Sequence, residues 1–293
     1  MVIFSLKESE TSNFVYCYFF PYRFTNHQDC KGRRTKYLTK RYLGQNFLFD
    51  PSILRRIIQV AQLKKDDLVV EIGPGPGRLT KMLAERVRKV IAIEIDSKLF
   101  KELSRELEEY KNVELIYGDA LKYPYEKLPE FKVVANIPYY ITTPIIFRLL
   151  NVRNNIKSMT LTVQKEVAER IIASPGGKDY GILSIFTQYY AEPRLKFTIS
   201  RRAFRPVPRV DSAVLHIKIL ERPSVTVKDE EMFFRVIKTA FSQRRKMLSN
   251  SLKGLREDIR ERILMAGINP DRRPETLAIS EFARLSDILT GTF

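Results

Sequence analysis

The chain has 293 residues, 44% of them hydrophobic and 29% charged, the composition of a globular protein with one large domain or two smaller ones. Its 51 lysines and arginines outnumber 34 acids, and the net charge of +17 indicates a polyanionic partner, either nucleic acid or an anionic membrane surface. No apolar stretch is long enough to span a bilayer, and a content of two cysteines and two histidines excludes a disulfide framework, predicts no metal site and fits a reducing, cytoplasmic compartment.

The first part of the chain does not resemble the rest. An aromatic run at residues 14–22 follows acidic residues and lacks the basic start and long apolar core of a signal peptide. We interpret residues 1–40 as an extension that is disordered, or that results from a start codon assigned too far upstream. A basic stretch without acids starts near the end of this extension and runs from Lys31 to Phe49; its basic residues, the basic arm, are Lys31, Arg33, Arg34, Lys36, Lys40 and Arg41.

From residue 41 onward, helix and strand patterns alternate. Asp50 and Pro51 are typical of a helix start, and apolar residues recur at helical spacing from Ile53 to Ala61. Further helices are predicted over residues 78–88 and 97–110. Buried strands are predicted over residues 68–72, 90–95, 113–117, 131–135 and 159–163, and residues 213–220 alternate like a strand at the edge of a sheet. This order predicts an α/β domain over residues 41–222, a parallel sheet with helices on both faces.

Strand patterns stop after about residue 228. Residues 230–252 and 257–267 have helical patterns, so residues 223–293 are predicted to form a small all-α domain.

Residues that could bind a ligand lie at or just after the ends of four successive predicted strands. Gly73, Gly75 and Gly77 come after the first strand, Glu94 lies in the second near its end, Asp119 follows the third, and Asn136 ends the fourth. Ligands of open α/β sheets bind outside the carboxyl ends of the strands. Glycines allow close approach of the backbone, Glu94 can bind ribose hydroxyls, and Asp119 can accept from an adenine amino group. This set predicts a cofactor that contains adenosine, although both acids would also fit ordinary loop-capping roles.

The glycine loop narrows the choice of cofactor. A dinucleotide-binding loop has the pattern GxGxxG, whereas this loop is GxGxG preceded by Glu71. The form resembles the first motif of class I methyltransferases, whose sulfonium cofactor has no phosphate and benefits from a nearby carboxylate. We therefore expect S-adenosyl-L-methionine and no metal, and a nucleotide-dependent oxidoreductase is the disfavoured alternative.

The tetrapeptide Asn136-Ile137-Pro138-Tyr139 ends the fourth strand. An exocyclic adenine amine is a poor nucleophile, because its lone pair is delocalised into the ring. The Asn136 side-chain carbonyl and a backbone carbonyl of the Ile137-Pro138 turn can accept its two N–H groups, and Tyr139 offers a face for the base to stack on. Alone, such a tetrapeptide is more often a turn; after this strand it predicts methylation of an amine.

Several motifs together resemble those of the rRNA adenine N6-dimethyltransferases, from about residue 41 to the end of the chain. They are residues 44–48 (GQNFL), 73–77 (GPGPG), 136–139 (NIPY) and 204–213 (FRPVPRVDSA). The resemblance implies a class I methyltransferase (Rossmann-like) fold with a seven-stranded sheet. It adds Asn46 and Leu48 to the cofactor site, and it implies that Phe204 stacks on the target adenine opposite Tyr139. Prolines after Phe204 predict an exposed loop; a buried core aromatic is the alternative.

Two branches of this family differ in their rRNA. Residues 240–248 (AFSQRRKML), 267–270 (GINP) and 273–277 (RPETL) are similar to the branch that dimethylates two adjacent adenines near the 3′ end of small-subunit (16S) rRNA, rather than to the branch that methylates the large subunit. The likeness implies a monomer that acts in ribosome biogenesis, with residues 223–293 recognising rRNA. A non-catalytic assembly protein of the same fold is the other alternative.

Two further basic clusters are expected to hold the rRNA backbone without reading its sequence. One lies in a single predicted loop and the other near the C-terminal helices. Their members are Arg201, Arg202, Arg205 and Arg209, and Arg244, Arg245 and Lys246.

Overall fold

The computed structural model describes residues 46–291, which form parts of two compact units. Among the described residues, the larger unit contains residues 46–226 with Glu275–Ile279, and the smaller contains Val227–Pro274 with residues 280–291. The basic arm, both cysteines and the first two residues of the GQNFL motif lie outside the described residues. Within the described part of the chain, no helix is long and apolar enough to cross a membrane.

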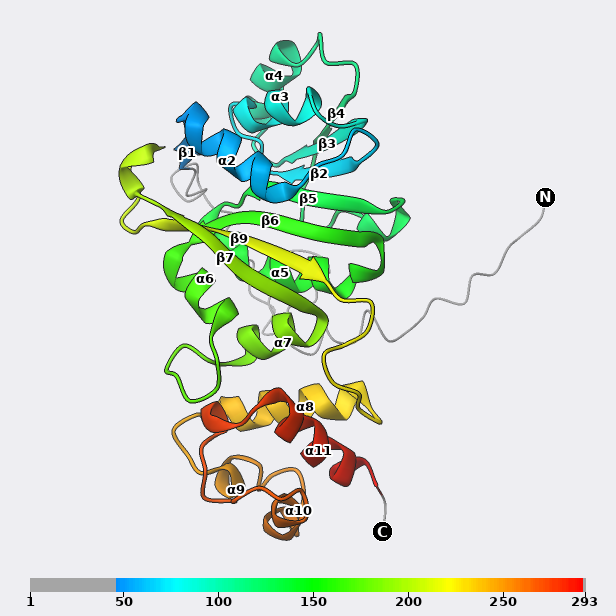
Figure 1. Cartoon of the computed structure of the whole chain (residues 1–293), viewed down its shortest axis with the longest axis vertical. Coiled ribbons are helices and arrows are strands. Elements are labelled where there is room, and N and C mark those ends of the chain that lie inside the picture. Colours follow the sequence, from blue (N-terminus) through cyan, green and yellow to red (C-terminus); the bar gives the residue numbers. More distant parts are fainter. Residues whose placement is uncertain (1–45, 292–293) are drawn as a thin grey trace, which may run out of the picture. The chain divides into compact units, whose positions relative to one another are not determined.

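A seven-stranded sheet forms the centre of the larger unit, as predicted (Figure 1). Its order is β4-β3-β2-β5-β6-β9-β7, in which the first five strands are parallel and the last two pair antiparallel. The strands are β2 (Leu68–Ile72), β3 (Lys89–Glu94), β4 (Val113–Tyr117), β5 (Phe131–Asn136), β6 (Ile156–Gln164), β7 (Ala191–Ile199) and β9 (Ser212–Ile219). A second, two-stranded sheet pairs β1 (Phe47–Leu48) with β8 (Phe204–Arg205).

The structure corrects the prediction of which strand lies at the edge of the sheet. β9, predicted as an edge strand, lies between β6 and β7, and the edge is β7. β7 contains Pro193, which has no N–H to donate to a ladder and is tolerated at an edge. Its exposed and partly buried residues alternate, because one face of this strand is more open than that of the central strands.

Helices cover both faces of the sheet (Figure 1). They are α2 (Pro51–Ala61), α3 (Arg78–Ala84), α4 (Ser97–Glu106), α5 (Thr142–Asn151), α6 (Lys165–Ile172) and α7 (Ile182–Tyr190). The start of α2 is as predicted: the Asp50 carboxylate accepts the Ser52 N–H at 2.8 Å and Pro51 occupies the first turn. α3 and α4 end several residues earlier than their sequence patterns indicate.

The hydrophobic core lies against both faces of the sheet. On one face, side chains of α2 and α3, among them Leu54 and Leu83, pack with Val69 and Val134 of the sheet. Successive strand residues point to opposite faces, and Val70 is also fully buried. The strands are therefore covered on both sides, and the loops at their carboxyl ends are held on a rigid base.

The smaller unit is helical where it is described. Its helices are α8 (Glu230–Ser242), α9 (Leu248–Ser251), α10 (Ile259–Met265) and α11 (Ile279–Thr290), the last starting one residue inside the larger unit. The helix predicted over residues 230–252 is wrong in its middle, because residues 243–247 form a turn that contains the basic cluster. The N–H groups of Leu248 and Ser249 donate to the carbonyls of Arg272 and Pro270, so a tertiary contact redirects the chain here.

Candidate active site

The predicted site residues meet at the carboxyl edge of the parallel strands. β2, β3, β4 and β5 all end there, followed by Gly73, Ile95, Gly118 and Ile137 respectively. Backbone hydrogen bonds connect these ends: Gly73 N–H donates to the Ile93 carbonyl at 3.0 Å, and Gly118 N–H donates to the Glu94 carbonyl at 2.9 Å. The sheet therefore gathers residues from four separate parts of the sequence.

The glycine loop needs its glycines for conformation and for space. Gly73, Gly75 and Gly77 have φ values of +66°, +56° and +74°, which side chains disfavour. A Cβ on Gly73 would lie 3.2 Å from the Pro138 ring, and one on Gly75 would lie 2.7 Å from the Phe47 ring. The loop is thus packed directly against two other predicted motifs.

Replacing Gly75 by alanine is expected to weaken cofactor binding by about tenfold and to lower the melting temperature. The backbone strain of a positive φ costs about 1–2 kcal/mol, and the new methyl group forces the Phe47 ring to move. Titration calorimetry with S-adenosylmethionine and thermal melts measure the two effects. Gly254→Ala is the control, since nothing lies within 4 Å of its Cβ position; equal effects of both changes would contradict the role of the loop.

Glu94 ties the glycine loop to the next helix. Its carboxylate accepts the Gly75 N–H at 3.3 Å and the Asp96 N–H at 2.8 Å, while Asp96 itself caps α4. Burial raises the pKa of Glu94, and the two N–H groups act in the opposite direction. Each carboxylate oxygen retains a lone pair, so loop capping and ribose binding are compatible roles.

Glu71 lies behind the loop and is 2% exposed. Burial raises its pKa to about 8, and the Glu94 carboxylate contributes to the rise. At neutral pH the Glu71 carboxyl is therefore mostly protonated, and a cation bound nearby would favour its ionised form.

Asn136 and Asn46 are joined although 90 residues separate them. The Asn136 side-chain N–H donates to the backbone carbonyl of Asn46 at 3.1 Å. This bond fixes the orientation of the amide, since its NH₂ group faces Asn46 and its Oδ1 atom is left to accept. In the following turn the Pro138 carbonyl accepts the Ile141 N–H, whereas the Ile137 carbonyl accepts no such turn bond among residues 46–291 and can serve as a second acceptor.

Tyr139 and Tyr140 follow on a short 3-10 helix, Tyr139–Ile141. The Tyr139 hydroxyl is 2.7 Å from the Ser212 hydroxyl at the start of β9. Burial raises the pKa of Tyr140, and the negative charges of Asp119 and Glu94 raise it further, so its phenol lies near both predicted cofactor acids. The Asp119 carboxylate also accepts the Leu121 N–H at 2.9 Å.

Sequence reasoning missed four residues of this edge. Phe47 packs on Gly75, Ser212 holds Tyr139, and Tyr140 lies near the two acids. Ile95 is 44% exposed directly after Glu94, where it offers an apolar surface beside the carboxylate. Two of them could have been predicted from their positions in the sequence, because Tyr140 and Ile95 each adjoin a residue that the motifs identified.

Phe204 does not lie on an exposed loop, so that prediction is wrong. Its side chain is fully buried in the core with Leu48, Leu54 and Val214, and it pairs with Leu48 across β1 and β8. Burial of an aromatic ring in an apolar core is favourable in free energy, and the prolines that follow Phe204 do not oppose it. Stacking on a base would require the ring to leave this cluster. The Leu48 side chain is likewise in the core, which leaves its backbone to contact a cofactor.

The first basic loop is exposed, and part of its donor capacity is used internally. The Arg201 guanidinium donates to the Arg209 carbonyl, and that of Arg205 donates to the Arg202 and Phe204 carbonyls. Arg202 is exposed. In the smaller unit Arg244 is half-buried, whereas Arg245 and Lys246 are exposed.

Comparison with known proteins identifies relatives over most of the chain. The family model of ribosomal RNA adenine dimethylase matches residues 37–291. The ribosomal RNA small subunit methyltransferase A of Clostridium acetobutylicum is 48% identical over 252 residues, covering 84% of this chain and 91% of the relative. The protein of that name from Moorella thermoacetica is 49% identical over 261 residues, with the same coverage.

Two solved structures have a similar fold. A dimethyladenosine transferase from Plasmodium falciparum superposes with a TM-score of 0.69 and 30% identity, covering 82% of this chain and 95% of that one. The 23S rRNA methyltransferase ErmE superposes with a TM-score of 0.66 and 30% identity, covering 84% of this chain and all of that one. Both solved structures support the fold described above. Because their names differ, they do not indicate which RNA this chain methylates, and that inference rests on the relatives found by sequence.

Proposed function

Because the chain belongs to the ribosomal RNA adenine dimethylase family, we propose that it transfers methyl groups from S-adenosylmethionine to N6 of two adjacent adenines in the 3′-terminal hairpin loop of small-subunit rRNA. The observation that carries the chemistry is the bond from the Asn136 amide to the Asn46 carbonyl, which orients Oδ1 as an acceptor. The choice of RNA rests on the relatives, whose name states that they act on the small subunit.

In this proposal Asn136 Oδ1 and the Ile137 carbonyl accept the two N–H groups of the adenine amine. That geometry favours a pyramidal nitrogen, whose lone pair can point at the methyl group to be transferred. Tyr139, held by Ser212, supplies a flat surface for the base, which must leave its stack to reach the site. No strong base is needed, because the methylated ammonium is acidic enough to lose its proton to water. Alignment and electrostatics carry the acceleration.

The residues at the edge of the sheet suit S-adenosylmethionine as the donor. Bound there, the cofactor would supply an electrophilic methyl group on a positively charged sulfur. The Glu94 carboxylate would hold the ribose hydroxyls, and Asp119 would accept from the adenine amino group. Gly73 and Gly75 let the backbone approach closely, and the buried acids Glu71 and Glu94 favour a cationic ligand.

Incubation of the protein with radiolabelled S-adenosylmethionine and under-methylated small ribosomal subunits, and in parallel with large subunits, tests the function. N6,N6-dimethyladenosine is expected in the small-subunit RNA after digestion to nucleosides. Label confined to large-subunit RNA would instead favour the activity in the name of ErmE. Binding without any transfer would favour the alternative of a non-catalytic assembly protein.

Changing Arg244 and Arg245 together to alanine is expected to weaken rRNA binding and to reduce its dependence on salt. For each phosphate that the variant no longer neutralises, the slope of log affinity against log salt becomes shallower by about 0.7–0.9. Filter binding over a range of salt concentrations measures this slope. Arg86→Ala with Arg88→Ala is a matched control at exposed positions outside the basic clusters; an equal change in slope would contradict a specific role of Arg244 and Arg245.

A further inference from the structure

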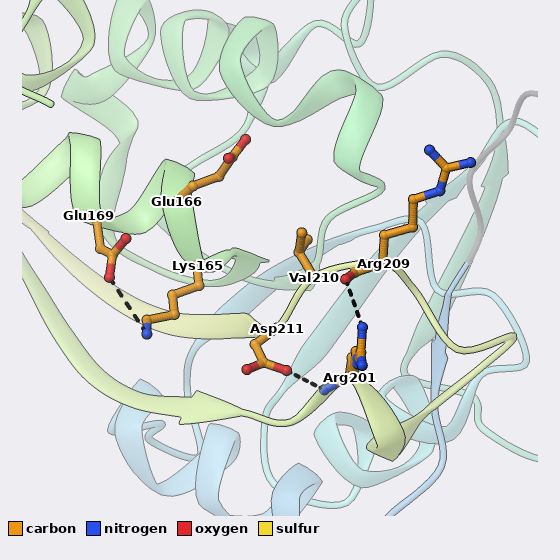
Figure 2. A pocket seen from close by; sticks show the side chains of 7 residues that line it. All are labelled: Lys165, Glu166, Glu169, Arg201, Arg209, Val210 and Asp211. Carbon is orange, nitrogen blue, oxygen red and sulfur yellow. Dashed lines mark hydrogen bonds and ion pairs between the residues drawn. The ribbon is translucent and has the colours of Figure 1, made fainter.

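A pocket of about 430 Å³ lies beside the acceptor motif, a volume within the range that small ligands occupy. It is lined by α6, by Arg201 in the short 3-10 helix that precedes β8, and by the segment between β8 and β9 (Figure 2). Its residues are Lys165, Glu166, Glu169, Arg201, Arg209, Val210 and Asp211.

The topology places this pocket next to Asn136 and Tyr139. β5, which ends at Asn136, pairs with β6, and Lys165 follows the end of β6. Asp211 directly precedes Ser212, whose hydroxyl bonds the Tyr139 hydroxyl at 2.7 Å. The pocket therefore begins one residue from the group that holds the stacking surface for the target base.

Some of the lining residues build the wall of the pocket. Asp211 accepts the Arg201 N–H at 2.9 Å, and its carbonyl accepts the Lys165 N–H at 3.0 Å. Lys165 also pairs loosely with Glu169 at 3.8 Å. These contacts tie α6 to the basic loop, so the wall does not depend on a ligand.

Two of the side chains that line the pocket take no part in the contacts that form this wall. Among residues 46–291, neither the Glu166 carboxylate nor the Arg209 guanidinium has a hydrogen bond or ion pair. Figure 2 shows both side chains extending away from the Lys165–Glu169 and Arg201–Asp211 contacts. The pocket thus presents one free acceptor group and one free donor group.

The charges of the lining are balanced, with three cations and three carboxylates. A site for phosphate alone would be lined by cations, because a carboxylate repels it. A carboxylate beside an arginine instead fits a whole nucleotide: carboxylates accept from the exocyclic amines of bases, and arginine binds phosphate.

We propose that this pocket binds the nucleotide next to the target adenine in the same RNA strand, with Glu166 accepting the amine of its base and Arg209 contacting its phosphate. The inference rests on the proposed function, in which that neighbour is a second adenine. The pocket would then select adjacent adenine pairs before either base is methylated.

Binding without chemistry tests this proposal. The full-length protein, saturated with S-adenosylhomocysteine, is titrated by fluorescence anisotropy with hairpin RNAs whose loop carries either two adjacent adenines or one adenine with uracil on one side or the other. The wild-type protein is expected to prefer the adenine pair by about tenfold over the hairpin that places uracil in the pocket. In Glu166→Ala this preference is expected to fall to about one, through weaker binding of the adenine pair.

Glu108→Ala is the matched control, since Glu108 is exposed and does not line the pocket. It should keep the wild-type preference. Equal tightening of all hairpins by Glu166→Ala would overturn the proposal, because Glu166 would then merely repel the backbone. An unchanged preference would overturn it as well. Failure of the proposed function is separate: the wild-type protein would then transfer no methyl group to small subunits.

Discussion

Asn136→Ala is expected to reduce methyl transfer by at least about 10²-fold while S-adenosylmethionine binding changes little. The substitution removes the Oδ1 acceptor that would hold one amine N–H, and loss of one preorganised polar group at a reacting centre costs about 10²–10³ in rate. It also removes the bond to Asn46, but the glycine loop keeps its contacts with Glu94 and Pro138. Single-turnover transfer and titration calorimetry measure the two quantities separately.

Asn250→Ala controls for the loss of an asparagine, since Asn250 is exposed on α9. Asn136→Asp is a further comparison: it keeps an acceptor but replaces the NH₂ group that donates to Asn46, so partial activity is expected. Unchanged turnover in Asn136→Ala would refute the acceptor role. A loss of cofactor affinity as large as the loss of rate would assign Asn136 to binding instead.

Lys132→Met is expected to destabilise the fold by about 3–5 kcal/mol, a large part of the stability of a domain. Lys132 and Asp67 are each 8% exposed, and they form an ion pair at 2.9 Å near the amino ends of β5 and β2, on the edge of the sheet opposite to the site. The ammonium also donates to the Gln62 carbonyl at 2.7 Å. The substitution leaves a buried carboxylate without its cation. Denaturant unfolding measures the loss.

The destabilisation should depend on pH. Burial alone would raise the pKa of Asp67, but the Lys132 ammonium and the Lys64 N–H outweigh it and hold the pKa below the ordinary 3.8. Stabilisation by a carboxylate with a lowered pKa is present above its unfolded value and is lost as the pH falls through the folded value. Without the ammonium, burial raises the pKa of Asp67 in Lys132→Met, so the difference between wild type and variant should begin to shrink above pH 3.8 and should continue to shrink as the pH falls through the lowered pKa of the wild type.

Lys89→Met provides the matched control, because Lys89 pairs with Glu114 at 2.6 Å but both side chains are about half exposed. Water screens such a pair, so little change in stability is expected. Equal destabilisation by the two substitutions would contradict the importance of burial.

Local patterns predicted those parts of the fold that local chemistry controls. The cap and first turn of α2 follow from Asp50 and Pro51. All five parallel strands follow from short apolar runs, and four of these runs are followed by or end in glycine, acid or asparagine. β7 was not identified individually, since its alternating residues and Pro193 resemble an exposed segment. Pairing with β9, across a distant part of the chain, decides that it is a strand.

The turn at residues 243–247 has a similar explanation. The sequence around it has helical character, but bonds from Leu248 and Ser249 to carbonyls at residues 270–272 stop the helix. Contacts with residues so far along the chain are not visible in a local pattern.

The sequence by itself predicted which groups form the candidate site: the glycine loop, the acids Glu94 and Asp119 and the motif that starts at Asn136 each lie at or just after a strand end, so their positions at one edge follow from the order of elements. Only the tertiary structure decided how these groups are oriented and covered. It turned the Asn136 amide toward Asn46, buried Phe204 in the core and left the side chains of Glu166 and Arg209 without a hydrogen-bond partner among residues 46–291. The physical reason is that a side chain's exposure and hydrogen bonds depend on neighbours brought from distant parts of the chain.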